Sequence, residues 1–242
     1  MKIADHLPCR VLTYGVNADN ADYCAKNVRF KADGVEYELV ADFIGRVSCP
    51  IPGRFSVYNS LCAASIAIAL GIDYKDVISA ISKSAGVKGR IEVVPTNTDY
   101  TVIIDYAHSP DGLENIITSL REIAKNRVVT VFGCGGDRDR TKRPKMGKIA
   151  AELSDFCVVT SDNPRSENPA AIIEDILEGM KNISTPYTVV ESRKEAIRWA
   201  MENAQPDDII LLAGKGHETY QILPTGTIHF DEREVIAEIL EK

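Results

Sequence analysis

The sequence has no long hydrophobic run and no export signal. None of its apolar stretches reaches the roughly 18 residues that span a bilayer. The first ten residues, MKIADHLPCR, lack the basic and then apolar plan of a signal peptide. We therefore expect a cytoplasmic protein without a membrane partner.

Basic residues are outnumbered by acidic ones, 28 Lys and Arg against 35 Asp and Glu, and closely spaced cysteine pairs are absent. The net charge is -7, so the summed field repels polyanions and argues against nucleic acid as a partner. The six cysteines never form a C-x-x-C pair, which argues against a zinc site or a disulfide framework and predicts buried thiols. His108 and His217 have no ligand partner at a useful spacing, so no metal site is assigned.

A phosphate-binding loop of the form G-x-x-x-x-G-K-[ST] is absent as well. The sequence opens on β-rich segments with no nucleotide-binding strand before them. These two features lead us to expect that the 242 residues are the later part of a larger protein.

Two regions with different patterns make up the sequence. Up to about residue 55 it is strand-like, and NVRFKADGVEYELV alternates on both sides of Asp33-Gly34, which predicts a hairpin. Helices are expected at 59–70 and 75–82. The glycine-rich segment 86–90 is expected to be a hinge.

From about residue 90 onward, continuous apolar segments alternate with amphipathic ones. This pattern predicts a doubly wound, mostly parallel, Rossmann-like α/β sheet with helices on both faces. The expected strands are 101–106, 127–133, 155–161, 187–192 and 208–214. The expected helices are 111–125, 145–153, 169–182 and 193–204.

Polar segments directly follow four of the expected strands. The loops at the carboxyl ends of parallel strands line the ligand crevice of an open sheet, so we expect these segments to converge there. They are residues 105–111, 133–138, 162–165 and 214–218.

The second polar segment continues into a basic run, with five Lys or Arg among residues 138–145. Such a run often only faces solvent. Beside a glycine-rich turn at the ligand edge, however, an arginine can grip a carboxylate or phosphate with two hydrogen bonds. We therefore favour an anion pocket that includes Arg138.

The third segment, residues 162–165, has two interpretations. Its Asp-Asn-Pro sequence is good turn chemistry and could simply lead into a helix. It also suits a small amino acid, because Asp162 and Asn163 offer acceptors to an ammonium group and Arg165 offers a guanidinium to a carboxylate.

Other polar residues extend this candidate site. Glu218 is expected to hold a second ammonium group, and Arg138 a second carboxylate. Asp105 and His108 are expected to contact a ribose or a phosphate. Lys215 is interpreted as a cation of the loop and is left out of the site.

Five motifs together resemble the C-terminal half of Mur ligases, in particular those that add meso-diaminopimelate. They are GRIEVV, DYAHSPDG, FGCGGDRDRTKRPKM, TSDNPRSENP and LLAGKGHETYQ. The resemblance runs in order through nearly all of residues 50–242, and the first fifty residues resemble late strands of the family's central, ATP-binding domain. It implies that residues 1–89 are part of that domain and residues 90–242 the amino-acid-binding C-terminal domain.

The resemblance implies an ATP- and Mg²⁺-dependent ligase. In this family ATP phosphorylates the terminal carboxylate of a UDP-linked muropeptide, here UDP-N-acetylmuramoyl-L-alanyl-D-glutamate, and the amine of the incoming amino acid attacks the acyl phosphate. The residues implied to bind meso-diaminopimelate are Arg138, Asp162, Asn163, Pro164, Arg165, Gly214 and Glu218. Those implied to lie around ATP are Asn59, Arg90, Asp105 and His108.

Arg165 is the residue expected to select the amino acid. The Asp-Asn-Pro-Arg form of the loop is associated with meso-diaminopimelate, and lysine-adding relatives lack this arginine. Diaminopimelate carries a distal carboxylate that lysine lacks, so an arginine is a selective contact.

The sequence departs from the family pattern at its front. The uridine-binding domain, the phosphate loop and the residues that organise Mg²⁺, including a carbamylated lysine, are not found in the 242 residues. We therefore expect this chain to be inactive alone. Two alternatives stay open: another member of the superfamily, such as a folylpolyglutamate or cyanophycin synthetase, and a non-catalytic module that binds an amino acid or nucleotide.

Overall fold

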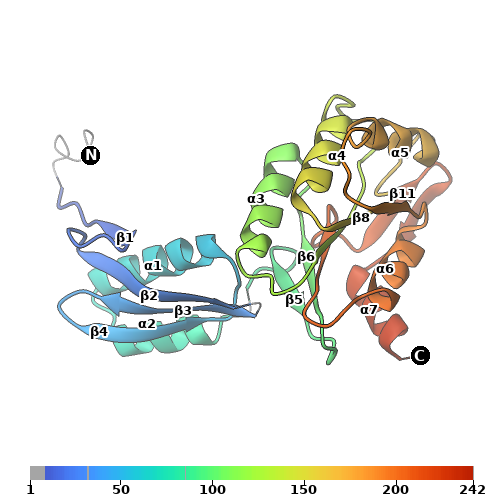
Figure 1. The fold of residues 1–242 in the computed structure, drawn as a ribbon. Helices are drawn as coiled ribbons and strands as arrows, with labels where there is room; N and C mark the ends of the chain where they lie inside the picture. Colours follow the sequence, from blue (N-terminus) through green and yellow to red (C-terminus); the bar gives the residue numbers. More distant parts are fainter. Residues whose placement is uncertain (1–8, 32, 85, 242) are drawn as a thin grey trace. The chain divides into compact units, whose positions relative to one another are not determined.

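A computed structural model describes residues 9–31, 33–84 and 86–241 of the chain. The chain forms two compact units, Met1–Ala85 and Gly86–Lys242 (Figure 1). Among the described residues, no helix is long and apolar enough to cross a membrane.

The first unit is a four-stranded sheet with two helices. Its strands lie in the order β1-β2-β3-β4, with β1 (Tyr14–Val16) parallel to β2 (Tyr23–Lys31). Strands β3 (Gly34–Val40) and β4 (Ile44–Cys49) continue the sheet antiparallel, and Lys31 pairs with Gly34 as the predicted hairpin requires. Residue 32 of that hairpin lies outside the described residues.

Helices α1 (Arg54–Ala69) and α2 (Tyr74–Ser82) complete the first unit's core with the buried side chains of the sheet. The predicted start of α1 at Asn59 is wrong by five residues. The helix begins after Gly53, which supplies no side-chain cap, so the sequence carries none of the usual start signals there. Asp73 does cap α2 through the amide of Lys75, and that helix was expected almost where it lies.

The second unit confirms the predicted doubly wound sheet. Its six strands lie in the order β5-β6-β10-β7-β8-β9, and every pair is parallel except β5 with β6. The strands are β5 (Glu92–Val94), β6 (Thr101–Asp105), β7 (Val128–Phe132), β8 (Phe156–Val159), β9 (Tyr187–Val189) and β10 (Ile209–Ala213).

Helices cover both faces of this sheet (Figure 1). Helices α3 (Pro110–Arg121), α4 (Lys142–Leu153) and α5 (Pro169–Glu178) pack in series on one face. Helices α6 (Arg193–Glu202) and α7 (Glu232–Leu240) pack together on the other. Polar caps begin most of them, as when Ser109 accepts from the amide of Gly112 at the start of α3.

Three elements of the second unit were not expected. They are the antiparallel edge strand β5, helix α7, and one hairpin that consists of two further strands, β11 (Tyr220–Leu223) and β12 (Gly226–His229). The hairpin follows the last polar segment, and its residues contact the candidate site.

The cysteines are only partly as expected. Cys24, Cys49, Cys134 and Cys157 are buried, whereas Cys62 is half-buried and Cys9 is exposed. The prediction of buried thiols is therefore wrong for Cys9. Cys9 is the first described residue, and it precedes β1, the first strand of the sheet.

Candidate functional site

The four polar segments of the sequence lie side by side at one edge of the second sheet. They follow β6, β10, β7 and β8, which are consecutive neighbours with parallel direction, so their carboxyl ends share one edge. A cleft of about 390 Å³ opens there. Among its lining residues are His108, Arg138, Asp162, Asn163, Arg165, Gly214 and Glu218.

Asn163 is the most connected residue of the third segment. Its Oδ1 accepts from Lys215 Nζ (3.1 Å) and from the amide of Ile222 (3.0 Å), and its Nδ2 donates to Glu218 Oε2 (2.9 Å). Because a carbonyl oxygen has two lone pairs, Oδ1 is fully used. The Asn163 side chain therefore holds the loops together, and its expected contact with a ligand's ammonium group stays a prediction.

Arg165 joins the third segment to the glycine-rich second one. Its Nη1 donates to the carbonyl oxygens of Gly136 (2.8 Å) and Asn163 (3.3 Å), and its φ of 53° is in the left-handed region. The amide of Gly136 in turn donates to the carbonyl oxygen of Asn163 at 2.9 Å. A Cβ at Gly136 would lie 1.9 Å from the carbonyl oxygen of Pro164, so the two loops fit only with glycine there.

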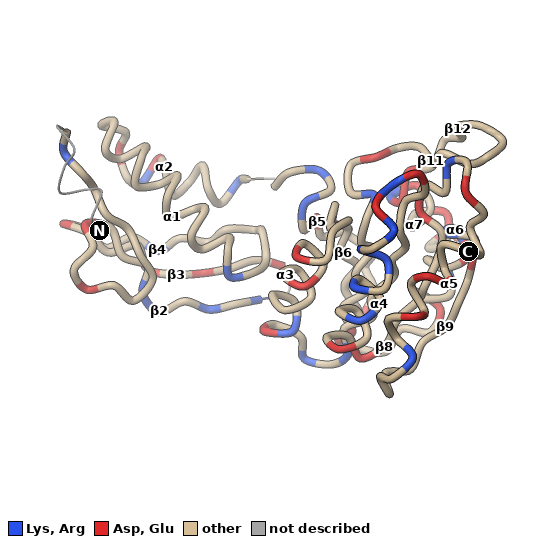
Figure 2. The backbone as a smooth tube through the Cα atoms, turned by 90° about the horizontal axis from the view of Figure 1, so that it is seen from above, with Lys and Arg blue, Asp and Glu red and all other residues tan. Residues whose placement is uncertain are grey.

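The basic run divides into two groups with different roles. Arg143 is fully buried, and with Arg140 it donates hydrogen bonds to Glu167. The contacts of Glu167 with Arg143, with the amide of Asp137 and with Arg140, in that order, lower its pKa to about 2. Both arginines therefore brace the loop. Arg138 is exposed and lines the cleft together with Lys142. Acidic and basic residues alternate along this segment before α4 (Figure 2).

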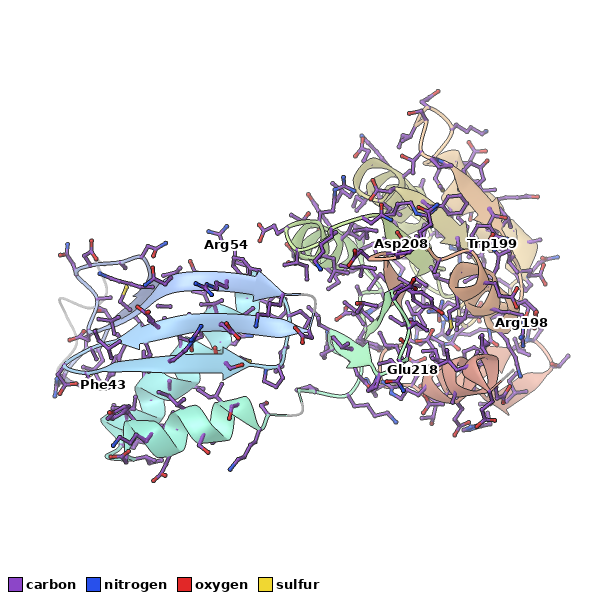
Figure 3. All side chains as sticks on the ribbon, turned by 60° about the horizontal axis from the view of Figure 1, so that its bottom comes forward. Phe43, Arg54, Arg198, Trp199, Asp208 and Glu218 are labelled. Atoms are coloured by element: carbon purple, nitrogen blue, oxygen red, sulfur yellow. The ribbon has the colours of Figure 1, made fainter. Side chains whose placement is uncertain are left out.

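Two carboxylates form the floor of the cleft. Asp162 has a side chain only 11 % exposed, and its Oδ2 would lie 2.6 Å from a Cβ on Gly214, whose φ is 120°. Glu218, labelled in Figure 3, follows β10 and has a side chain 14 % exposed. Glycine at position 214 therefore leaves room for the Asp162 carboxylate at the base of the cleft.

Lys215 is the residue that the sequence interpretation missed. It was taken as a cation of the loop, yet it is fully buried and donates to Asn163 Oδ1 and Glu218 Oε2 (3.2 Å). The rings of Tyr220 and Phe230 lie 5.7 and 5.9 Å from its Nζ. Tyr220 lies in β11 of the unexpected hairpin, and Phe230 directly follows β12. No local pattern around Lys215 therefore predicts that its side chain is buried.

A second buried pair stands behind the floor. Arg193 and Glu232, at the start of α6 and α7, are both buried; Arg193 Nε donates to Glu232 Oε1 at 2.9 Å, and Nη2 forms an ion pair with the same oxygen at 2.8 Å. Burial raises the pKa of Glu232, and Arg193 opposes that effect. Arg193 Nη1 lies 4.0 Å from Asp162 Oδ2, so the guanidinium faces the floor carboxylate without hydrogen-bonding it.

Asp105 is engaged by its own backbone surroundings. Its Oδ2 accepts from the amide of Ile91 (2.9 Å) and its Oδ1 from the amide of Ala107 (2.8 Å). Burial raises its pKa, and these amides oppose the rise. Asp105 therefore fixes the turn after β6, and a ribose would have to share oxygens already in use.

The other residues expected near ATP are exposed. The Arg90 guanidinium lies 5.1 Å from the ring centroid of Tyr106, and the rings of Tyr106 and His108 are 4.6 Å apart. These three residues present a cation and aromatic faces on one surface of the second unit. Asn59 lies on α1 in the first unit and is exposed.

The expected hinge at 86–90 is tied to the second unit. The amide of Gly89 donates to Glu92 Oε2 (2.6 Å), and Glu92 forms an ion pair with Arg233, whose Nη2 donates to the carbonyl oxygen of Gly216. A Cβ at Gly89 would lie 2.1 Å from the amide nitrogen of His217. Residues 88–92 are therefore held against the loop after β10, so the later part of the expected hinge is fixed to the second unit.

The site thus combines an acidic floor with a basic rim. Asp162 and Glu218 can accept hydrogen bonds from ammonium groups, and Arg138 and Arg165 can donate to carboxylates. Cys134 also lines the cleft, but burial raises its pKa to about 12, so its thiol stays protonated and is a poor nucleophile. The arrangement is suited to binding a zwitterion.

This fold and this order of motifs define a family. Residues 89–216 match the model described as "Mur ligase, glutamate ligase domain", and residues 1–67 match the "Mur ligase middle domain". The chain belongs to the Mur ligase family.

Relatives with related names cover this chain almost completely. The UDP-N-acetylmuramoyl-L-alanyl-D-glutamate--2,6-diaminopimelate ligase of Caldanaerobacter subterraneus subsp. tengcongensis is 52 % identical over 232 residues, which are 96 % of this chain and 48 % of the relative. The ligase of the same name numbered 1 in Clostridium acetobutylicum is 48 % identical over 234 residues, with the same shares covered. This chain therefore spans about half the length of the curated relatives it matches.

A solved structure gives the same result. The structure of a UDP-N-acetylmuramoyl-L-alanyl-D-glutamate--2,6-diaminopimelate ligase superposes with a TM-score of 0.78 at 33 % identity. The match covers 99 % of this chain and 50 % of that one.

Proposed function

We propose that this chain is the amino-acid-binding part of an ATP-dependent ligase that adds meso-diaminopimelate to UDP-N-acetylmuramoyl-L-alanyl-D-glutamate. The observation that supports it most directly is the cleft after β6, β10, β7 and β8, with two carboxylates on its floor and two arginines on its rim. The names of the relatives at about half identity point to the same substrates.

The cleft suits diaminopimelate because that molecule has two ammonium and two carboxylate groups. We assign Asp162 and Glu218 to the ammonium groups and Arg138 and Arg165 to the carboxylates, with Gly214 lining the cleft. Asn163 and Pro164 position the loop. In this assignment the chain binds and orients the amine that attacks the activated substrate.

ATP and Mg²⁺ belong to the same proposal. Arg90 and the exposed ring of His108, beside Tyr106, fit the phosphates and sugar of a nucleotide, and Asp105 keeps the turn that carries them in shape. The resemblance to the Mur ligases also implies a contact between ATP and Asn59, which lies in the first unit. ATP would supply the activation of the substrate carboxylate, and the Mg²⁺ ligands belong to parts of the family's sequence that the 242 residues do not contain.

The proposed domains follow the family's plan. Residues 1–89 are assigned to the central domain and residues 90–242 to the C-terminal domain. The compact units divide four residues earlier, at Ala85, because residues 88–92 are bound to the second unit.

Calorimetric titration of the chain with meso-diaminopimelate, L-lysine and ADP tests this assignment. We expect diaminopimelate to bind and lysine to bind more weakly, because lysine offers no distal carboxylate to the rim arginines. Nucleotide binding without diaminopimelate binding would favour another superfamily member, such as a folylpolyglutamate synthetase. No binding of diaminopimelate would contradict the proposal.

A further inference from the structure

Lys215 is a buried cation in direct contact with the proposed substrate site. Its side chain is 0 % exposed, and its Nζ donates to Glu218 Oε2 at 3.2 Å and to Asn163 Oδ1 at 3.1 Å. Burying a charge is costly even when it is paired, and an apolar residue of similar size would often serve stability as well. The location of Lys215 therefore calls for a role in the site itself.

The contacts of Lys215 determine which atoms of the floor stay open. Glu218 Oε2 is shared by Lys215 Nζ and Asn163 Nδ2, so Glu218 Oε1 is the oxygen left for a ligand. Asn163 Oδ1 is also held, by Lys215 and by the amide of Ile222. One ammonium group thus fixes two residues from loops that are more than fifty positions apart in the chain.

Lys215 also limits the negative charge of the floor. Asp162 and Glu218 carry two formal negative charges, and Lys215 reduces the sum to one. The deeper Arg193–Glu232 pair contributes one charge of each sign and leaves this sum unchanged. Without Lys215 the net charge of the floor would be more negative by one, beside the position of the distal ammonium group.

We propose that Lys215 is a positioning and specificity residue of the amino-acid site. It holds Glu218 and Asn163 in place and keeps the net charge of the floor at minus one, which balances one ammonium group. A floor of this charge favours a ligand whose distal end carries both an ammonium and a carboxylate over one whose distal end carries an ammonium alone. This inference rests on the proposed function, since the ligand it concerns is diaminopimelate in preference to lysine.

The test compares binding of meso-diaminopimelate and of L-lysine to the wild-type chain and to Lys215→Met. The variant loses the two hydrogen bonds donated by Lys215 Nζ, and the net charge of the floor becomes more negative by one. We expect the Kd for diaminopimelate to rise about tenfold or more, and that for lysine to rise much less. The preference for diaminopimelate should therefore fall about tenfold.

Charge compensation separates this role from a purely structural one. Glu218→Gln brings the net charge of the floor to zero and should increase the preference for diaminopimelate over lysine, the opposite of the change expected for Lys215→Met. The double variant Lys215→Met/Glu218→Gln restores a floor charge of minus one, so its preference should return to within about threefold of the wild-type value. A structural role predicts that the double variant loses both ligands and shows no such return.

Lys181→Met is the matched control. Lys181 forms an ion pair with Glu178 at the same three-residue separation, but both side chains are about 60 % exposed. This variant should leave both Kd values unchanged, because an exposed pair of this kind contributes little. Thermal unfolding shows whether each variant is folded before its Kd values are compared.

The outcomes distinguish this inference from the proposed function. If the wild-type chain does not bind diaminopimelate, the proposed function fails, and a crystal structure of Lys215→Met still tests whether Glu218 leaves hydrogen-bond distance of Asn163. If the wild-type chain binds and the folded Lys215→Met variant keeps the same preference, the inference is overturned and the proposed function stands. A Glu218 that stays in place in the crystal structure also overturns the positioning role.

Discussion

Arg165 Nη1 donates a hydrogen bond to the carbonyl oxygen of Gly136 at 2.8 Å. This contact connects the loop after β8 to the loop after β7, and it fixes the guanidinium at the rim of the cleft. The arginine expected to select the substrate is therefore held in position by the backbone before any ligand binds, which reduces the conformational entropy lost on binding.

Replacing Arg165 tests its role in selecting the amino acid. In a complete ligase that contains this chain, Arg165→Ala should raise the KM for meso-diaminopimelate at least about tenfold, because a charged hydrogen bond is worth roughly 1.5–3 kcal/mol. Arg46→Ala is the control, since the Arg46 side chain is 71 % exposed and its 3.6 Å ion pair with Glu36 contributes little. An unchanged KM in the Arg165 variant would remove Arg165 from the site.

Gly136 tests the fit between the same two loops. A Cβ there would meet the carbonyl oxygen of Pro164 at 1.9 Å, so Gly136→Ala should displace the loop, cost about 1–3 kcal/mol of stability and abolish diaminopimelate binding. Gly71→Ala serves for comparison, because its Cβ would meet nothing within 4 Å. That control has a φ of 89° and should lose about 1–2 kcal/mol of stability without losing binding. Calorimetry and thermal unfolding measure both variants, and normal binding by Gly136→Ala would refute the proposed fit.

Glu167 gives a prediction about pH. Its pKa is lowered to about 2 from an ordinary value of 4.5, so its contacts stabilise the folded state above about pH 4.5, and that stabilisation is lost as the pH falls toward 2. Glu167→Gln should therefore lower the Tm most at pH 5 to 7, and the difference from wild type should shrink steadily at pH 4 and 3. Glu178→Gln, at an exposed site, should show no such trend. A difference that stays constant with pH would contradict the assignment.

Arg233 tests whether residues 88–92 are bound to the second unit. It pairs with Glu92 and donates to the carbonyl oxygen of Gly216, so Arg233→Met should speed hydrogen exchange of the backbone amides in this segment. Lys148→Met removes an exposed i,i+4 pair in α4 and should leave that exchange unchanged. Rapid exchange of the segment in the wild-type chain itself would support the original expectation of a hinge.

The chain alone should not catalyse ligation. The reason is that the 242 residues contain no phosphate-loop sequence, whereas the proposed function requires ATP to be activated beside the proposed amino-acid site. The measurement is release of phosphate and formation of product from ATP, diaminopimelate and the UDP-linked muropeptide. Ligation above background by the purified chain would disprove this expectation.

Most of the second unit could be predicted because its strands are continuous apolar segments that are buried on both faces. Burial of this kind leaves a clear pattern in the sequence, and β6, β7, β8 and β10 lie almost where they were expected. The edge strand β5 has only three residues and no buried ones, so it leaves no such pattern. The start of α1 was missed for a similar reason, since Gly53 gives no capping signal.

The candidate site could be located from the sequence, but the roles of its atoms could not. Parallel strands bring their ends together whatever their sequence, which is why four polar segments predicted one cleft. The burial of Lys215 depends on Tyr220 and Phe230, which the chain folds back over it. The full use of Asn163 Oδ1 depends on that same burial, and no local pattern reports contacts between loops so far apart.

The position of β10 between β6 and β7 has a consequence for the synthesis of the protein. Both flanking strands are translated before β10, and in the sheet they have no shared neighbour until residues 209–213 have been made. Pairing across such a large separation in sequence is slow, because a long loop must close before the contacts can form. Residues 209–213 must therefore be translated before the cleft can assemble, and until then β6 and β7 each have an open edge with which other chains or chaperones can pair.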